Sequence, residues 1–434
     1  MRRLLFISPH FPPDASAGAH RARVLAPHLE AAGWRPTVLT VEPSAYDGVL
    51  DLELGEMVTP KVDVVRVPAF KPGATRRLGF GDLGLRALPG LWRAAKKLFE
   101  QQRFDATYIT TYPVYPALIG PRLRAYTNAP LVVDLQDPWT GAWGLTVGGG
   151  PDGAPDLRSR LSRHVLGMIE EQVLPACDAV TGVSSELIQQ LRDRYPVLRD
   201  RPSLTLPIGI DPMDLDWVCS HPREIDAFNP ADGNFHLCSV GTLLPLAIEP
   251  LRAVFAAILR LRRSDPALTA RLRLHFIGTS NQSDANAPPR VMPIAHEAGV
   301  ADLVTEEPRR IPFADALRVQ LAASALLVLG STESRYNASK IAPSLVVRRP
   351  LVVIAHEASG MIEQLRYAHS RGVRVIPFGD SREGLNASVR SLLAEWLGTP
   401  PQRPDTLRLL AGLTAPALAA QLGGLLDGVA EAHG

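Results

Sequence analysis

The amino-acid sequence predicts a two-domain α/β protein with a parallel sheet in each half. Its 434 residues exceed what one hydrophobic core usually serves, so two domains of about 200 residues are expected. Short apolar strands alternate with helical patterns from the N-terminus onward, which is typical of βαβ units. A second series of the same kind begins after a Pro-rich connector at 201–212.

The first half opens with a βαβ unit. A buried strand is expected at 4–8, followed by a loop of small residues, a helix over 19–32 and a second strand over 36–40. Apolar runs predict four further strands, at 64–67, 106–110, 131–135 and 179–183.

The second half repeats the alternation. Strands are expected at 235–240, 272–277, 326–329, 351–354 and 373–376, with helices at 248–263, 313–323 and 383–396. We therefore expect an N-terminal domain over 1–205 and a C-terminal domain over 206–403. A last helical stretch, 404–434, is expected to cross back onto the first domain.

Composition excludes several classes of protein. Lys and Arg number 46 against 44 for Asp and Glu, which argues against a dedicated nucleic-acid binder. Only three cysteines occur, without a CxxC pair, which fits a reducing cytoplasm. The apolar run Leu4–Ile7 is too short for a signal peptide, and no window reaches the roughly 18 apolar residues of a membrane span. We expect a cytoplasmic protein, soluble or attached to a membrane surface.

The first loop, residues 8–21, lacks the GxGxxG pattern of dinucleotide-binding proteins. Small residues there precede a helix N-terminus, where backbone N–H groups favour anions. His20 and Arg21 lie in the first turn, within reach of a bound phosphate or sugar. Solvation of the helix surface is the competing explanation for Arg21 and the preferred one for Arg23.

A second candidate group follows the strand at 131–135. The segment places Asp134, Asp137 and Trp139 at the strand's carboxyl end, where ligand sites of α/β proteins lie. Carboxylates there can accept sugar hydroxyls or a proton, and an indole offers a stacking face. The alternative is that Asp137-Pro starts a turn and Trp139 packs in the core. Asp134 suits a structural role, so Asp137 is the better functional candidate.

These segments resemble retaining GT-B glycosyltransferases. The run from Phe6 to Thr40 is similar to the family's opening. The Asp134–Trp139 segment resembles that of the bacterial, glycosyltransferase family 4-like subgroup that builds surface polysaccharides. Four more segments extend the likeness over nearly the whole chain, namely 179–185, 206–211, the glycine turn 239–242 and the donor-binding helix at 339–350.

The resemblance implies two Rossmann-like domains that face a central cleft. The N-terminal domain would bind a glycan or lipid-linked saccharide acceptor, and the C-terminal domain a nucleotide sugar. The sugar would be transferred with retention and without a metal or other cofactor. Positive side chains and helix N-termini would then stabilise the departing diphosphate.

The resemblance also assigns residues to roles. Asp137 and Lys340 are the catalytic candidates. Groups expected to bind the donor are Gly241, Thr242, Arg309, Arg310, Glu333, Arg335, Asn337 and Ser339. Groups expected to bind the acceptor are Gly18, His20, Arg21, Asp134 and Trp139.

Several family groups are missing from the donor half. Pro343 stands where a Glu normally holds the ribose, and Arg335 stands where its partner Glu is expected, with Glu333 close by. No Arg or Lys follows Gly241 closely, and the interdomain Asn is Ile208. Loss of each of the two donor cations and of the ribose carboxylate is expected to weaken donor binding by about 1–3 kcal/mol. A second hypothesis is therefore a catalytically degenerate GT-B protein that binds glycan or a partner glycosyltransferase; a nucleotide-sugar epimerase ranks last.

Residues 76–103 combine seven Arg and Lys with Leu, Phe and Trp. A basic amphipathic stretch of this kind suits an anionic membrane surface and would place the acceptor side near a lipid-linked saccharide. The alternative is that the apolar residues pack inward and the charges solvate the outer face.

Overall fold

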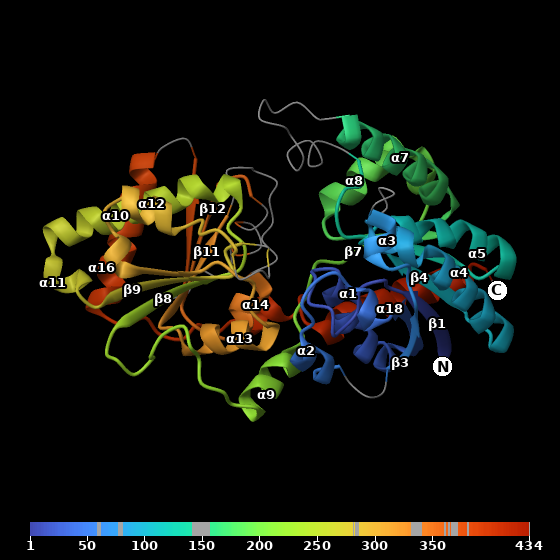
Figure 1. Cartoon of the computed structure of the whole chain (residues 1–434), viewed down its shortest axis with the longest axis horizontal. Coiled ribbons are helices and arrows are strands. Elements are labelled where there is room, and N and C mark those ends of the chain that lie inside the picture. The colour runs from blue at the N-terminus through green and yellow to red at the C-terminus, as the bar shows by residue number, and fades with distance from the viewer. Residues whose placement is uncertain are drawn as a thin grey trace. The chain divides into compact units, whose positions relative to one another are not determined.

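The computed structural model describes residues 1–58, 62–76, 81–140, 157–280, 282, 286–330, 341–359, 362, 365, 372–379 and 382–433. The chain forms two compact units (Figure 1). Unit 1 comprises Met1–Gly209 and Ala415–Gly434, and unit 2 comprises Ile210–Thr414. The boundary lies at 209 instead of the expected 205, and the returning segment begins at 415 instead of 404.

Unit 1 contains a parallel sheet of seven strands in the order β3-β2-β1-β4-β5-β6-β7. The strand order reverses between β1 and β4, and ligands of such sheets bind at the carboxyl ends of the strands beside that reversal. The strands are β1 (Arg2–Ile7), β2 (Trp34–Val41), β3 (Asp63–Val67), β4 (Ala106–Thr110), β5 (Leu131–Leu135), β6 (Ala179–Gly182) and β7 (Ser203–Thr205).

Helices cover both faces of this sheet because its strands are apolar on both sides. Leu5 and Ile7 of β1 share one core with α4, α5, α7 and α8, while Leu4 and Phe6 share the other with α1 and α18. The helices of unit 1 are α1 (Ala19–Leu25), α2 (Leu52–Glu56), α3 (Pro72–Arg76), α4 (Leu83–Gln101), α5 (Ile119–Thr127), α7 (Leu157–Val173), α8 (Ser185–Arg194) and α18 (Ala415–Glu431).

The helix expected at 19–32 is shorter in the structure. α1 ends at Leu25, and two 3₁₀ turns, 26–28 and 30–32, complete the segment. Pro27 lies in the first of these turns and has no backbone N–H for a continuing α-helix. Gly33 ends the segment with a φ of 85°, a left-handed conformation that glycine adopts without strain.

The C-terminal helix α18 packs on the first strands of unit 1, beside α1 in Figure 1. The Arg2 guanidinium donates to Asp427 at 2.5 Å, and the Trp34 indole donates to the same carboxylate at 3.1 Å. Leu418, Leu422 and the other apolar residues of its inner face are buried. The end of the chain is therefore part of the unit that holds its beginning.

Unit 2 contains a parallel sheet of six strands in the order β10-β9-β8-β11-β12-β13, which reverses between β8 and β11. The strands are β8 (Phe235–Val240), β9 (Leu272–Ile277), β10 (Val304–Glu307), β11 (Ala325–Leu329), β12 (Leu351–His356) and β13 (Val373–Phe378). The helices are α9 (Pro212–Ser220), α10 (Ile248–Ser264), α11 (Pro266–Thr269), α12 (Met292–Glu297), α13 (Phe313–Ala322), α14 (Ile341–Val346), α16 (Arg382–Gly398) and α17 (Leu407–Leu410).

A buried histidine pair lies in the sheet of unit 2. His236 Nδ1 on β8 is 2.9 Å from His275 Nε2 on β9, and Phe228 stacks on both rings. Asp232 accepts at 2.9 Å from His236, and Thr305 lies 2.7 Å from His275 Nδ1. Burial, with a smaller effect of the His236 charge, lowers the pKa of His275 to about 4, so its ring stays neutral at neutral pH.

The stretch 76–103 packs against unit 1. The inner face of α4 buries Leu83 and Leu91, and Trp92 packs half-buried on the same core. Arg86 is buried, and its guanidinium donates to the Asp47 carboxylate at 2.9 Å. The structure therefore favours inward packing over a membrane-facing apolar surface, with 77–80 outside the described residues. Within the described part of the chain, no helix is long and apolar enough to cross a bilayer.

Candidate functional site

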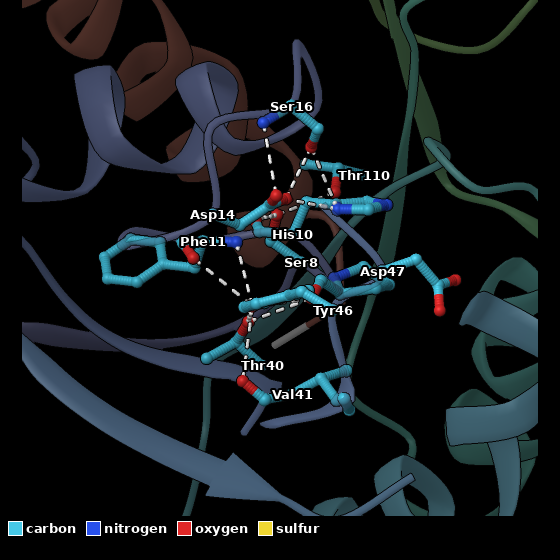
Figure 2. Close-up of polar contacts among 12 residues, drawn as sticks. Ser8, His10, Phe11, Asp14, Ser16, Thr40, Val41, Tyr46, Asp47 and Thr110 are labelled. Carbon is cyan, nitrogen blue, oxygen red and sulfur yellow. Dashed lines mark hydrogen bonds and ion pairs between the residues drawn. The ribbon is translucent and has the colours of Figure 1, made fainter. Parts of the chain in front are cut away.

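The first candidate group lies at the carboxyl end of β1 (Figure 2). His10 Nδ1 is 2.5 Å from Asp14 Oδ2. The Ser16 hydroxyl lies 2.9 Å from the same imidazole nitrogen and donates to the same carboxylate oxygen at 2.5 Å. None of these residues was singled out from the sequence. Their contacts close a His–Asp–Ser cluster beside the reversal in strand order, where a ligand of this sheet would bind.

The cluster leaves one imidazole nitrogen available. Burial tends to raise the pKa of Asp14, but the hydrogen bonds and charge of His10 and the hydrogen bonds from Ser16 outweigh it and hold the pKa below its usual value. An ionised Asp14 favours the proton on His10 Nδ1. His10 Nε2 makes no hydrogen bond with any residue in the described ranges, so this nitrogen can receive a ligand hydroxyl.

Buried hydroxyl groups hold the backbone of this loop. The Tyr46 hydroxyl lies 3.2 Å from the carbonyl oxygens of Pro9, Phe11 and Val41 and accepts from the Phe11 N–H at 3.3 Å. Burial raises the pKa of Tyr46, so the hydroxyl keeps its proton. The His10 ring stacks on the Tyr46 ring with centroids 5.9 Å apart. The imidazole therefore lies against a tyrosine whose hydroxyl is hydrogen-bonded to the loop backbone (Figure 2).

Gly18, expected at the acceptor site, lies against this cluster. A Cβ atom at Gly18 would come within 2.4 Å of Tyr112 Cδ1 and 3.3 Å of His10 Cδ2. The absence of a side chain at Gly18 lets the two rings approach the loop closely. Tyr112 is 39% exposed, so its ring offers an accessible apolar face beside His10.

Arg21 and Asp134, both expected at the acceptor site, form a buried ion pair. Arg21 Nε is 3.1 Å from Asp134 Oδ2, and their side chains are 2% and 0% exposed. Thr181 donates to the Asp134 carboxylate at 2.6 Å, and Arg21 also donates to the Leu206 carbonyl oxygen at 2.8 Å. Protein groups therefore contact both charges, so in this structure the pair has a positioning role, and ligand contact by Arg21 or Asp134 stays a prediction. The pair joins α1, β5 and β6 beneath the loops.

Trp139 also differs from the expectation. Trp139 is 6% exposed and belongs to the core, and its indole N–H donates to the Thr111 hydroxyl at 3.0 Å. Within the described part of the chain, the ring is thus almost wholly covered, as the core-packing alternative predicted. His20 is half-buried at the start of α1, and its Nδ1 accepts from Arg23 at 3.4 Å.

Two carboxyl groups of unit 1 have raised pKa values. Asp137 is exposed to solvent, and desolvation by the protein atoms around its carboxyl group raises its pKa to about 6. Burial also raises the pKa of Asp82, which caps α4 by accepting from the Leu85 N–H at 3.0 Å. The charge of His10 acts on Asp82 in the opposite direction. A carboxyl with a pKa near 6 can exchange a proton at neutral pH, which suits acid–base chemistry.

In unit 2 the glycine turn follows β8 as expected. Gly241 has a φ of 109°, and its N–H donates to the Ile277 carbonyl oxygen at 2.7 Å. The Leu243 N–H donates to the Thr279 carbonyl oxygen at 2.9 Å. These bonds hold the turn, including the half-buried Thr242, against the loop after β9. The turn lies at the reversal in strand order of this sheet, the usual ligand position.

The two arginines expected at the diphosphate follow β10. The Arg309 guanidinium donates to both carboxylate oxygens of Glu307, at 2.8 and 2.9 Å. Its charge is therefore compensated by its own neighbour. Arg310 is half-buried, and its backbone N–H donates to the Gln282 carbonyl oxygen at 2.9 Å.

The remaining expected donor groups, Glu333, Arg335, Asn337, Ser339 and Lys340, lie outside the described residues. Pro343 is the third residue of α14, so this helix carries no carboxylate at that position. Over the ranges that the structure describes, no group of three or more His, Cys, Asp or Glu residues has a metal-binding arrangement.

Sequence reasoning missed a positive side chain beside the glycine turn. Arg290 Nη1 donates to the Leu243 carbonyl oxygen at 3.0 Å. Its backbone N–H donates at 2.8 Å to Glu306 on β10. The spacing from the turn to this arginine is long, so only the paired strands β8, β9 and β10 bring them together.

Part of unit 1 is similar to a known family and to two curated proteins. Residues 16–207 match the family model of the Glycosyl transferase 4-like domain. A D-inositol 3-phosphate glycosyltransferase of Geodermatophilus obscurus is 29% identical over 160 residues, which are 35% of this chain and 31% of that protein. The enzyme of the same name from Stackebrandtia nassauensis is 34% identical over 147 residues, 31% of this chain and 30% of that protein. The match thus spans less than a third of these curated relatives.

Solved structures match the whole chain. Anabaena HepE, in complex with UDP and glucose, has a TM-score of 0.60 and 12% identity and covers 99% of this chain and 100% of its own. A UDP-forming trehalose-phosphate synthase of Burkholderia xenovorans has a TM-score of 0.62 and 14% identity, with coverage of 99% and 100%. A Rickettsia africae glycosyltransferase has a TM-score of 0.59 and 11% identity, with coverage of 99% and 98%. The chain therefore has the GT-B fold, and the predicted fold class of two Rossmann-like domains is confirmed.

Proposed function

We propose that this protein is a glycosyltransferase that moves a sugar from a nucleotide-sugar donor to a glycan or lipid-linked acceptor in surface-polysaccharide synthesis. The observation that carries the proposal is the match of residues 16–207 to a glycosyltransferase domain within a chain of GT-B fold. The relatives' names support the same reaction class, with UDP and glucose bound in Anabaena HepE. The site of action would be cytoplasmic, at the inner face of the membrane where the acceptor is lipid-linked.

Unit 1 would bind the acceptor. His10 Nε2, oriented by Asp14, would accept a hydrogen bond from an acceptor hydroxyl, and the exposed Tyr112 ring would pack against the sugar. Asp137 would act as a carboxylate near the reacting hydroxyl, because a pKa of about 6 leaves it mostly ionised at neutral pH. Arg21 and Asp134 would position these loops from below.

Unit 2 would bind the nucleotide sugar beside Gly241 and Thr242, at the reversal of its sheet. Lys340 remains the proposed cation for the departing diphosphate, with Ser339 and Asn337 as further donors. Charge stabilisation by side chains would replace a metal ion, and the transfer would retain anomeric configuration.

A panel of nucleotides and nucleotide sugars in a thermal-shift assay tests the donor half of this proposal. We expect at least one nucleoside diphosphate and its sugar conjugate to raise the melting temperature, and Lys340→Ala to reduce the shift. Arg252→Ala is a matched control because Arg252 forms an exposed pair with Glu297. No stabilisation by any member of the panel would count against a donor site.

Two observations favour a second candidate, a degenerate GT-B protein that binds glycan without catalysis. Pro343 in α14 cannot hold a ribose hydroxyl, and Arg309 is paired with Glu307. Glycan binding without any nucleotide-dependent stabilisation would favour this candidate. Stabilisation by a nucleotide sugar would favour the enzyme.

A further inference from the structure

We propose that Arg290 supplies the positive charge that binds the donor diphosphate beside the glycine turn of unit 2. The inference deepens the proposed function, on which it rests, because it names the residue that recognises a nucleoside diphosphate. The expected cations are missing from the turn itself: residues 242–251 contain no Arg or Lys. A diphosphate carries at least two negative charges, so its site needs a cation from elsewhere.

The guanidinium of Arg290 reaches this turn from another part of the chain. Arg290 Nη1 donates to the Leu243 carbonyl oxygen at 3.0 Å. The Leu243 N–H is itself bonded to the Thr279 carbonyl oxygen at 2.9 Å, so both backbone polar groups of Leu243 are hydrogen-bonded. The guanidinium charge of Arg290 therefore lies beside Leu243, which follows Gly241 by two residues at the carboxyl end of β8.

Glu306 fixes the backbone that carries Arg290. One carboxylate oxygen accepts from the Arg290 N–H at 2.8 Å, and the other accepts from the N–H groups of Val291 and Met292 at 3.0 and 2.8 Å. The Thr279 hydroxyl donates to the same carboxylate. The Glu306 carboxylate thus accepts four hydrogen bonds. These bonds hold the backbone at the start of α12 and so fix the position of the Arg290 Cα.

The charge of Arg290 has no acidic partner within the described residues. No carboxylate there lies within ion-pair distance of its guanidinium, whereas Arg309 is bonded to Glu307 through two nitrogens. A guanidinium has five N–H donors, and the bond to Leu243 uses one. The remaining donors can bind two phosphate oxygens in the planar geometry that arginine favours.

Isothermal titration calorimetry with UDP, GDP and ADP, and with the nucleoside of each, tests this inference. Arg290→Gln keeps a neutral donor for the Leu243 carbonyl oxygen but removes the charge, and Arg290→Lys keeps the charge. Arg252→Gln is the matched control, since it removes an exposed arginine of the same unit. The melting temperature of each variant shows whether its fold is intact.

We expect Arg290→Gln to weaken binding of the diphosphate that the wild type binds by roughly 10- to 100-fold, and to leave nucleoside binding unchanged. Arg290→Lys should retain part of the affinity, and Arg252→Gln should match the wild type. Unchanged diphosphate affinity in Arg290→Gln would overturn the inference, as would an equal loss for the nucleoside, which a structural role would produce. If the wild type binds none of the three diphosphates, the proposed function itself fails.

Discussion

The buried pair of Arg21 and Asp134 allows a quantitative test of the organisation of unit 1. Replacement of Arg21 by Met keeps most of the side-chain volume and removes the charge. Asp134, with 0% of its side chain exposed, would then keep its Thr181 partner but lose its counter-ion. The carbonyl oxygens of Leu206 and Pro207 would also lose donors that now lie at 2.8 and 3.0 Å.

Removal of one partner from a buried ion pair usually costs about 3–5 kcal/mol. The two carbonyl oxygens add to this cost unless water reaches them, so we expect Arg21→Met to lower the free energy of unfolding by at least about 3 kcal/mol. Arg35→Met is the control, because Arg35 and Asp63 pair on the surface with side chains 49% and 52% exposed. Such a pair contributes less than about 1 kcal/mol.

Urea unfolding followed by tryptophan fluorescence measures this difference, since Trp34 is buried in the core that α1 contributes to. The double variant Arg21→Met with Asp134→Leu should recover much of the loss, because it leaves no unpaired charge. A loss below about 1 kcal/mol in Arg21→Met, with normal folding, would refute the reasoning. It would mean that the pair is open to solvent and available to ligands.

Further predictions follow from individual groups. Asp137→Asn should lower kcat/KM at least about 100-fold. In the wild type, kcat/KM should fall as the pH drops below the Asp137 pKa of about 6. A flat pH profile would exclude Asp137 as the titrating group. Gly18→Ala should displace Tyr112 and raise the acceptor KM more than the donor KM, measured by varying each substrate; equal changes would contradict the placement of Gly18. His275 has a folded-state pKa of about 4, below its unfolded value of about 6.5. The neutral ring therefore contributes to stability above pH 6.5, and this contribution is lost as the pH falls toward 4. Urea unfolding across this range should show a shallower decline for His275→Gln than for the wild type, and identical slopes would contradict the shift.

The fold could be predicted because its signals are local. Strand and helix patterns lie within short segments, and most predicted strands match the observed ones. The edge strand β10 was missed because Thr305, Glu306 and Glu307 make it look like a polar loop. Its outer position in the sheet tolerates these side chains.

The candidate site was harder to predict because distant partners decide the role of each residue. Asp134 and Trp139 stand at a strand end, as ligand-binding residues do. Their partners are Thr181 on β6 and Thr111, which follows β4, and both bonds lie inside the protein. His10 became a candidate only once the loop was seen to fold around Tyr46, a contact that no local pattern indicates.

The most direct test of the central claim is mass-spectrometric detection of glycosyl transfer. The purified protein would be incubated with nucleotide sugars and with lipid-linked or free saccharide acceptors. We predict that one donor yields its nucleoside diphosphate together with an acceptor heavier by one sugar residue, and that Asp137→Asn abolishes both products. Saccharide binding with no transfer from any donor, even at high enzyme concentration, would contradict the assignment as a glycosyltransferase.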